Sequence, residues 1–214
     1  MERERGKLLS NARSLLVRTC YSESWKACQS LLLLAPGWWR ARAAAARTRL
    51  EWGKAEEEGD DHLLAAIVHF DVALASIDEG DAESPTAAVE RIELSNDRGV
   101  ALYELGRLDE ARASFDRVLE LQPGHERALC NLGLIHWTLG HHRAALSTFD
   151  HAIASANGRN PHSLNNRGVR AFAGTPLAHH SPPETLVPVV RCTLPCRACM
   201  CFLVPALGRR FALS

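Results

Sequence analysis

The sequence predicts an all-α fold of stacked helical hairpins followed by an irregular, disordered C-terminal tail. The first observation is a recurring phrase: residues 96–100 (NDRGV) return as residues 165–169 (NNRGV), and residues 131–134 (NLGL) stand between them. The glycines of these three segments are 34 and then 35 residues apart. The second observation is that apolar residues recur at helical spacing within each period. A fixed period of this size is typical of a solenoid in which each hairpin buries the apolar flank of its neighbour.

Residues 81–160 contain two well-matched units of this kind. Each unit has two helical patterns separated by a short turn, at residues 105–107 (LGR) and 139–141 (LGH). The glycine of each turn permits the left-handed backbone that ends a helix. Gly99 is expected where the two helices of the hairpin cross closely, and Phe115 is expected to fill the groove against the next unit.

Residues 92–125 resemble the tetratricopeptide repeat (TPR). The family pattern of Leu-Gly, Ala, Phe and Pro is matched by residues 105–111 (LGRLDEA) and 115–123 (FDRVLELQP), and Pro123 is expected to end the second helix. Residues 126–159 form a second match, which departs at its end because Asn157 stands where a proline is usual. The resemblance implies that the first helices of successive hairpins line a concave groove.

Upstream, residues 1–80 are expected to form degenerate TPR-like hairpins. The second-helix spacing recurs at Ala66, Phe70 and Ala73, preceded by residues 52–53 (Trp-Gly) in place of Leu-Gly. A long first helix is predicted from about residue 38 to residue 57. An acidic break at 78–83 separates the weak units from the strong ones, and residues 84–85 (Ser-Pro) indicate a helix cap and first helical residue.

Downstream, residues 161–172 start a further TPR that is incomplete, and residues 173–214 form the Pro/Cys-rich tail. Six of the ten prolines and four of the seven cysteines lie in this tail, so no helical period survives there. Two explanations compete: a tail with its own ligand or partner, or a chain cut from a longer array and ended by unrelated sequence. The second is favoured, because a repeat that stops within a hairpin leaves its apolar face uncovered.

The composition gives no support for nucleic-acid binding, membrane insertion or secretion. Lysine plus arginine equal aspartate plus glutamate, 25 each, so the net charge favours neither nucleic acid nor a membrane surface as a partner. The strongest positive run, residues 40–49, is interpreted as a solvated helix face. The chain has no stretch of 18 uninterrupted apolar residues, so no membrane-spanning helix is predicted. Glu2 and Glu4 stand beside Arg3 and Arg5 with no clean apolar stretch after them, which argues against a secretory signal. Cytoplasmic residence is expected, with a nuclear or organellar location as an alternative.

No catalytic, cofactor or metal site is predicted. The chain has neither a nucleophile elbow nor a glycine-rich phosphate loop, so it is not expected to be an enzyme. Four cysteines invite interpretation as a zinc site: Cys192, Cys196, Cys199 and Cys201. They are crowded into ten residues without a loop between pairs, which makes tetrahedral closure awkward, and free thiols are the favoured interpretation.

The TPR resemblance implies a peptide-binding groove. The residues expected to line it are Asn96, Asp97, Tyr103, Arg127, Asn131, Leu134, Trp137 and Asn166. In TPR families an asparagine at the place of Asn131 and Asn166 often binds the main chain of an extended peptide, since a carboxamide offers both a donor and an acceptor. The alternative is that these asparagines only hydrate the groove. Arg127 is the cation best placed for an acidic residue or a terminal carboxylate.

The sequence therefore predicts a protein-interaction scaffold that binds an extended partner segment. One alternative is an assembly subunit that self-associates through its uncapped end or docks through the arginine-bearing helix. Another is a co-chaperone-type adaptor, although its clamp for two carboxylates is incomplete. Asn96, His162 and Asn166 stand where some of the cations of that clamp are expected.

Overall fold

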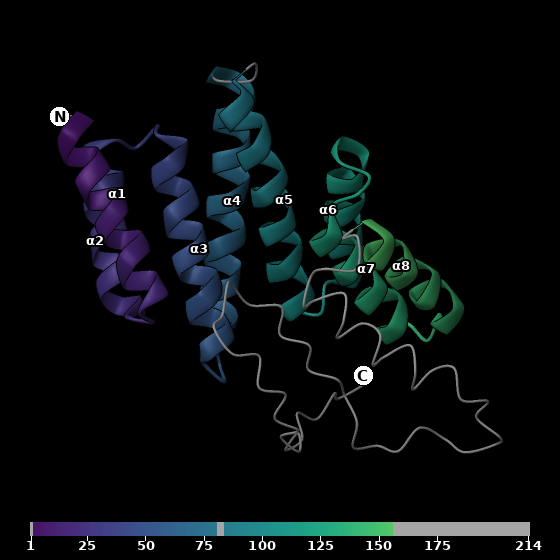
Figure 1. The fold of residues 1–214 in the computed structure, drawn as a ribbon. Coiled ribbons are helices and arrows are strands. Elements are labelled where there is room, and N and C mark those ends of the chain that lie inside the picture. Colours follow the sequence, from purple (N-terminus) through teal and green to yellow (C-terminus); the bar gives the residue numbers. More distant parts are fainter. Residues whose placement is uncertain (1, 81–83, 156–214) are drawn as a thin grey trace.

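A computed structural model describes residues 2–80 and 84–155 of the chain (Figure 1), and these residues form eight α-helices without a β-strand. The helices are α1 (Glu2–Val17), α2 (Tyr21–Leu34), α3 (Trp39–Ala55), α4 (Asp60–Gly80), α5 (Pro85–Glu104), α6 (Leu108–Leu121), α7 (Glu126–Thr138) and α8 (His142–Ser155). The predicted incomplete repeat over 161–172, the predicted tail over 173–214 and Asn166 lie outside the described residues.

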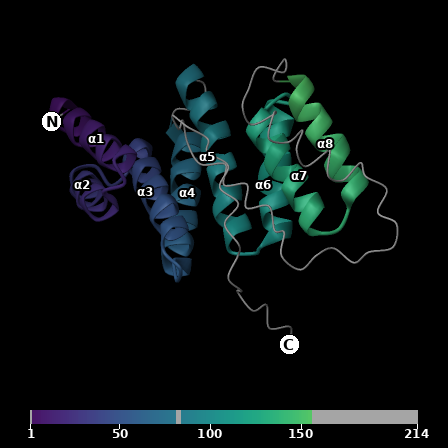
Figure 2. The same cartoon turned by 60° about the horizontal axis from the view of Figure 1, so that its bottom comes forward.

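The helices pair in chain order into hairpins, α1 with α2, α3 with α4, α5 with α6 and α7 with α8, and each hairpin packs on the next. Figures 1 and 2 show the hairpins standing side by side in a row. Each first helix also contacts the first helix of the next hairpin, whereas within the described ranges no second helix contacts the next second helix. The row therefore curves toward α1, α3, α5 and α7. We call this side the first-helix face and the opposite side the outer face.

The predicted turns are present in the two C-terminal hairpins. Gly106 (φ +74°) and Gly140 (φ +77°) adopt the left-handed conformation directly after α5 and α7. The amide N–H of Gly106 donates to the carbonyl oxygen of Tyr103 at 2.9 Å, which closes the end of α5. Ser84 and Pro85 stand at the cap and start of α5, and α6 ends two residues before Pro123, as the sequence predicts.

The second hairpin confirms the predicted long first helix, which is α3. Gly53 is buried inside this helix and does not end it as the glycine of a Leu-Gly turn does. A β-carbon on Gly59 would overlap the backbone of Gly53. These two glycines therefore allow the chain to approach itself closely where α3 leads into α4.

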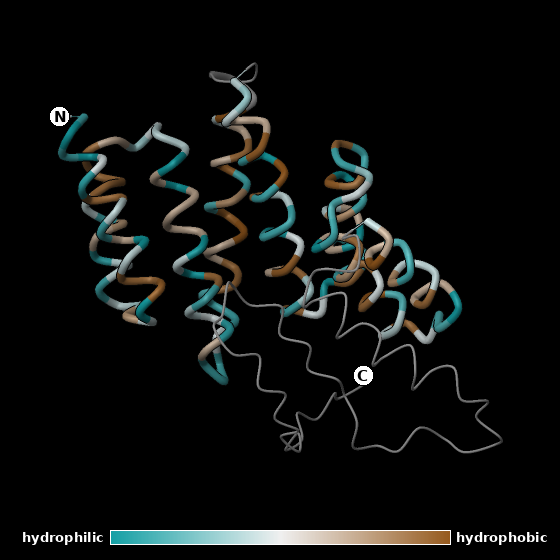
Figure 3. Tube along the Cα trace, viewed as in Figure 1, coloured by the Kyte–Doolittle hydropathy of each residue, from teal (hydrophilic) through white to brown (hydrophobic). Residues whose placement is uncertain are grey.

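The core contains one phenylalanine from each of three second helices: Phe70, Phe115 and Phe149, all fully buried. Phe115 packs on Gly99 and Phe149 on Gly133, within a single hairpin in each case. Phe115 therefore packs inside its own hairpin, a contact that the expectation of a groove against the next unit did not include. Apolar residues of α3 to α7 form one continuous cluster, in which Ala128 and Ile135 are the residues from α7. Figure 3 shows apolar and polar residues alternating along each helix, as expected for helices with one buried flank.

Hydroxyl groups join the first hairpin to the second. Ser24 Oγ donates to the carbonyl oxygen of Ala12 at 2.9 Å and lies 3.0 Å from Thr48 Oγ1. Thr48 Oγ1 in turn donates to the carbonyl oxygen of Ala44. Ser24 and Thr48 are almost completely buried, and these hydrogen bonds satisfy their polar groups. None of the helices described is long and apolar enough to cross a membrane.

Candidate functional site

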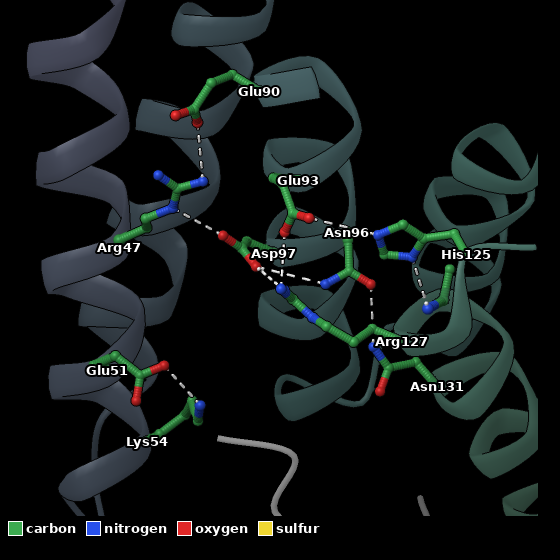
Figure 4. Close-up of polar contacts among 11 residues, drawn as sticks. Arg47, Glu51, Lys54, Glu90, Glu93, Asn96, Asp97, His125, Arg127 and Asn131 are labelled. Atoms are coloured by element: carbon green, nitrogen blue, oxygen red, sulfur yellow. Dashed lines mark hydrogen bonds and ion pairs between the residues drawn. The ribbon is translucent and has the colours of Figure 1, made fainter. Parts of the chain in front are cut away.

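The first-helix face carries a polar network built from α3, α5 and α7 (Figure 4). Helix α5 supplies Glu90, Glu93 and Asp97, whose spacing of three and four residues places them on one side of the helix. Arg47 reaches them from α3 and Arg127 from α7. Three consecutive hairpins therefore contribute to one cluster, which we call the polar network.

Asp97 bridges the two arginines. Its Oδ2 atom accepts a hydrogen bond from Arg47 Nε at 3.0 Å, and its Oδ1 atom accepts one from a terminal nitrogen of Arg127 at 2.9 Å. Arg47 also pairs with Glu90 at 3.1 Å. The Asp97 side chain is only 15 % exposed, so these bonds are less screened than those of a surface ion pair. Burial opposes the charge of Arg47, but the charges of Asp97 and Glu90 outweigh it and raise the arginine pKa.

Glu93 is held from α7 and from the residue that precedes that helix. One oxygen accepts a hydrogen bond from Arg127 at 2.8 Å, and the other lies 3.6 Å from His125 Nε2. His125 Nδ1 accepts the backbone N–H of Ala128, which caps α7 and places the ring proton on Nε2, toward Glu93. The His125 ring, and after it the charge of Arg127, lower the pKa of Glu93 to about 2.

Two asparagines connect α5 with α7 below the ion pairs. Asn131 Nδ2 donates to Asn96 Oδ1 at 3.3 Å, and Asn96 Nδ2 lies 3.5 Å from Asp97 Oδ1. Asn96 is fully buried and Asn131 is 8 % exposed. Asn131 Oδ1 accepts no hydrogen bond from the described residues.

The aromatic and aliphatic residues predicted for the groove lie further along α5 and α7. Tyr103, Leu134 and Trp137 are all partly exposed. The Tyr103 hydroxyl lies 3.4 Å from Thr138 Oγ1, which links the ends of the two first helices. The Trp137 ring lies 4.6 Å from the ring of His142 at the start of α8.

The structure thus brings four of the predicted groove residues into one network: Asn96, Asp97, Arg127 and Asn131. It also shows what they contact. Both terminal nitrogens of Arg127 are bound to carboxylates of α5, and the amide nitrogen of Asn131 is bound to Asn96.

Four members of the network were not predicted: Arg47, Glu90, Glu93 and His125. The interpretation of residues 40–49 as a solvated helix face is wrong for Arg47, which is 26 % exposed and bound to two carboxylates. The available signal was the spacing of the acids on α5, which places their carboxylates along one side of that helix.

The described residues contain no group of three or more His, Cys, Asp or Glu side chains that could hold a metal ion. Cys192, Cys196, Cys199 and Cys201 lie outside them. Cys28 and Cys130 are buried and form no disulfide within the described residues, and burial raises the pKa of the Cys28 thiol.

The two C-terminal hairpins match a known repeat family. The family model of the tetratricopeptide repeat matches residues 90–157. Residues 90–157 of this chain are tetratricopeptide repeats. The matched residues include α6, α7 and α8 and most of α5, so the α5 and α7 parts of the polar network lie within recognised TPR sequence.

Several solved structures share the fold of this chain. The thermophilic TPR protein TTC0263 of Thermus thermophilus superposes with a TM-score of 0.61 at 19% identity, covering 78% of this chain and 79% of that one. MamA superposes with a TM-score of 0.57 at 15% identity, covering 72% of this chain and 80% of that one. A TPR protein of Parabacteroides merdae superposes with a TM-score of 0.54 at 16% identity, covering 80% of this chain and 60% of that one. At these identities the likeness concerns the fold alone. A search of curated proteins finds no match.

Proposed function

We propose that this protein is an interaction scaffold that binds an extended segment of a partner protein along the first-helix face, over α5 and α7. The TPR fold suggests an interaction scaffold in general. The observation that supports this particular surface most is the polar network, in which side chains of three consecutive first helices are joined on one face.

The network holds its side chains in place before a partner arrives. Asp97 is fixed by two arginines, and Arg127 by two carboxylates. Immobilising a long side chain on binding costs about 0.5–1.5 kcal/mol, and a network that is already ordered avoids this cost. A partner would therefore meet a preorganised surface.

Asn131 offers the contact best suited to an extended main chain. Its Nδ2 atom is fixed by Asn96, which orients the carboxamide, and its Oδ1 atom accepts no hydrogen bond from the described residues. A backbone N–H of the partner could donate to this oxygen. Tyr103, Leu134 and Trp137 are partly exposed on the same two helices and would give apolar and aromatic contact beside it.

The charges of the network support a neutral or basic partner segment. Three carboxylates, of Glu90, Glu93 and Asp97, face the two guanidinium groups of Arg47 and Arg127. A partner carboxylate would have to displace Glu93 or Asp97 from Arg127. The co-chaperone type of partner, which is held by its carboxylates, is therefore less favoured than a segment bound through its main chain.

Position-specific crosslinking tests the proposal. The full-length chain carries p-benzoylphenylalanine in place of Tyr103 or Leu134 and is irradiated in cells, with the same residue at exposed Arg117 of α6 as the matched control. We expect positions 103 and 134 to crosslink to the same segment of one partner, and position 117 not to. The same product at position 117 would overturn the assignment of the surface.

The crosslinked segment is then synthesised as a peptide and titrated by calorimetry. We expect Asn131→Ala to weaken binding roughly 5- to 10-fold, the equivalent of one hydrogen bond. Arg117→Gln should bind as the unchanged chain does. Equal affinity for the unchanged chain and Asn131→Ala would contradict the role of the asparagine.

A further inference from the structure

The outer face carries an apolar line along α4. Leu64, Val68 and Val72 are 46%, 61% and 39% exposed, and their four-residue spacing places them one above another. The opposite side of α4 is completely buried through Ala66, Phe70 and Ala73. The line is therefore additional to the core side of the helix, and we call it the α4 stripe.

Two arginines of α3 lie along one edge of this region. Arg42 and Arg49 are seven residues apart, two helical turns, and so share one side of α3. The guanidinium carbon of Arg49 lies 4.0 Å from the centre of the Trp25 ring of α2, and one of its terminal nitrogens lies 2.5 Å from His62 Nδ1 of α4. Neither arginine forms an ion pair with an acidic residue in the described part of the chain.

His69 connects these arginines with the α4 stripe, because it follows Val68 directly. Burial, and after it the charges of Arg42 and Arg49, lower the pKa of His69 to about 4. The Nε atoms of both arginines and Nδ1 of His69 are buried without a hydrogen-bond partner in the described residues. Among those residues, this edge of the stripe has positive charge and unmatched nitrogen atoms without a carboxylate paired to them.

The charged groups on the other edge of the α4 stripe are paired with each other. Asp71 accepts a hydrogen bond from Arg98 Nε at 2.5 Å, and Arg98 also donates to Ser114 Oγ at 2.9 Å. The charge on this edge is thus compensated within the protein. The two edges differ, because the edge toward α2 has two arginines that form no ion pair with a carboxylate in the described residues.

We propose that the α4 stripe, together with Arg42 and Arg49, is a second interaction surface that takes an amphipathic helix of a partner protein with an acidic edge. Apolar side chains of that helix at three- and four-residue spacing would cover Leu64, Val68 and Val72. Asp or Glu side chains on its edge toward α2 would pair with the two arginines, and carboxylates accept from guanidinium groups in favourable geometry. A basic helix would instead meet like charge. Arg42 and Arg49 lie on the side of α3 opposite Arg47 of the polar network, so this surface does not depend on what the first-helix face binds.

A designed probe tests this surface on the full-length chain. The probe is a stapled helical peptide of about 18 residues with leucines along one side and glutamates along one edge, and its control has lysines in place of the glutamates. Fluorescence anisotropy should show at least ~10-fold tighter binding of the glutamate peptide. Arg42→Gln with Arg49→Gln should bring the two affinities within about 2-fold, and Val68→Asp should weaken both peptides.

The matched control is Arg117→Gln with Arg143→Gln, which removes two exposed arginines from α6 and α8 and should leave the preference unchanged. Circular dichroism checks that each variant is folded, and Arg42→Gln alone replaces the double variant if loss of the Arg49–Trp25 contact disturbs the fold. Equal binding of both peptides, or a preference that survives the double change, would overturn the proposal. So would sedimentation showing that the unchanged chain self-associates and Val68→Asp does not, because the occupant would then be a second copy.

Discussion

The ring of Phe115 occupies the space into which a side chain on Gly99 would project. A β-carbon on Gly99 would stand 2.6 Å from Phe115 Cε1 and 2.8 Å from Cζ. Gly133 and Phe149 repeat this relationship one hairpin later. The absence of a side chain on the first helix thus sets how closely the second helix approaches, and it does so at equivalent positions of two repeats.

We predict that Gly99→Ala destabilises the fold. Alanine is favoured over glycine within a helix by up to about 1 kcal/mol, but overpacking a core costs about 1–3 kcal/mol. Phe115 is fully buried and cannot move away freely, so the packing cost should dominate. We expect a net loss of about 1–2 kcal/mol in the free energy of unfolding, measured by urea titration.

The matched control is Gly6→Ala in α1, where a β-carbon would meet nothing within 4 Å. This change should be neutral or stabilise the fold by about 0.5–1 kcal/mol. A stabilised Gly99→Ala protein would contradict the close packing of Phe115 on the first helix.

A second prediction separates backbone strain from packing. Gly106 has φ +74°, and a β-carbon there would meet no atom within 4 Å. Gly106→Ala should therefore cost about 1–2 kcal/mol through the left-handed conformation alone. Gly106→Asn should cost less, because asparagine tolerates this conformation better. Thermal unfolding of the two variants measures the difference, and an equal loss for both would argue against a conformational cause.

The hairpins were predictable because their signals are local or periodic. Gly99, Gly106 and Phe115 stand at positions where the backbone or the packing accepts few residue types, and the 34-residue period repeats them. The long first helix through Gly53 was also predicted, but the reason for a glycine at that position was not. Only the structure shows that the residue it approaches is Gly59.

The polar network was predictable only in part. The repeat register places Asp97, Arg127 and Asn131 on first helices that share a face. It does not say that Arg47, 50 residues before Asp97, reaches the same carboxylate. Nor does it say that Arg127 is already bound to Glu93 and Asp97. Pairing across hairpins depends on the offset between neighbouring helices, which the pattern within one repeat does not contain.

The bridging role of Asp97 leads to a third prediction. Asp97→Asn keeps the shape of the side chain but removes the charge that Arg47 and Arg127 share. We expect a loss of about 1–2 kcal/mol, because hydrogen bonds to charged and partly buried groups are stronger than those at the surface. The control is Glu110→Gln, which breaks the exposed Arg107–Glu110 pair and should cost less than about 0.5 kcal/mol. Chemical denaturation that gave the two variants equal losses would contradict the bridge.

The last prediction concerns the acid sensitivity of the network. The pKa of Glu93 is lowered from its ordinary 4.5 to about 2, first by His125 and then by Arg127, so the unfolded chain binds this proton more readily than the folded one. The stabilisation is therefore fully present above about pH 4.5 and is lost as the pH falls through about 2. Glu93→Gln should be less stable than the unchanged chain at neutral pH, and the difference should shrink between these two values. Urea titrations across this range, with Glu110→Gln as the exposed control, measure it. A difference that stays constant down to the lower pH would mean that Glu93 gains nothing from its partners.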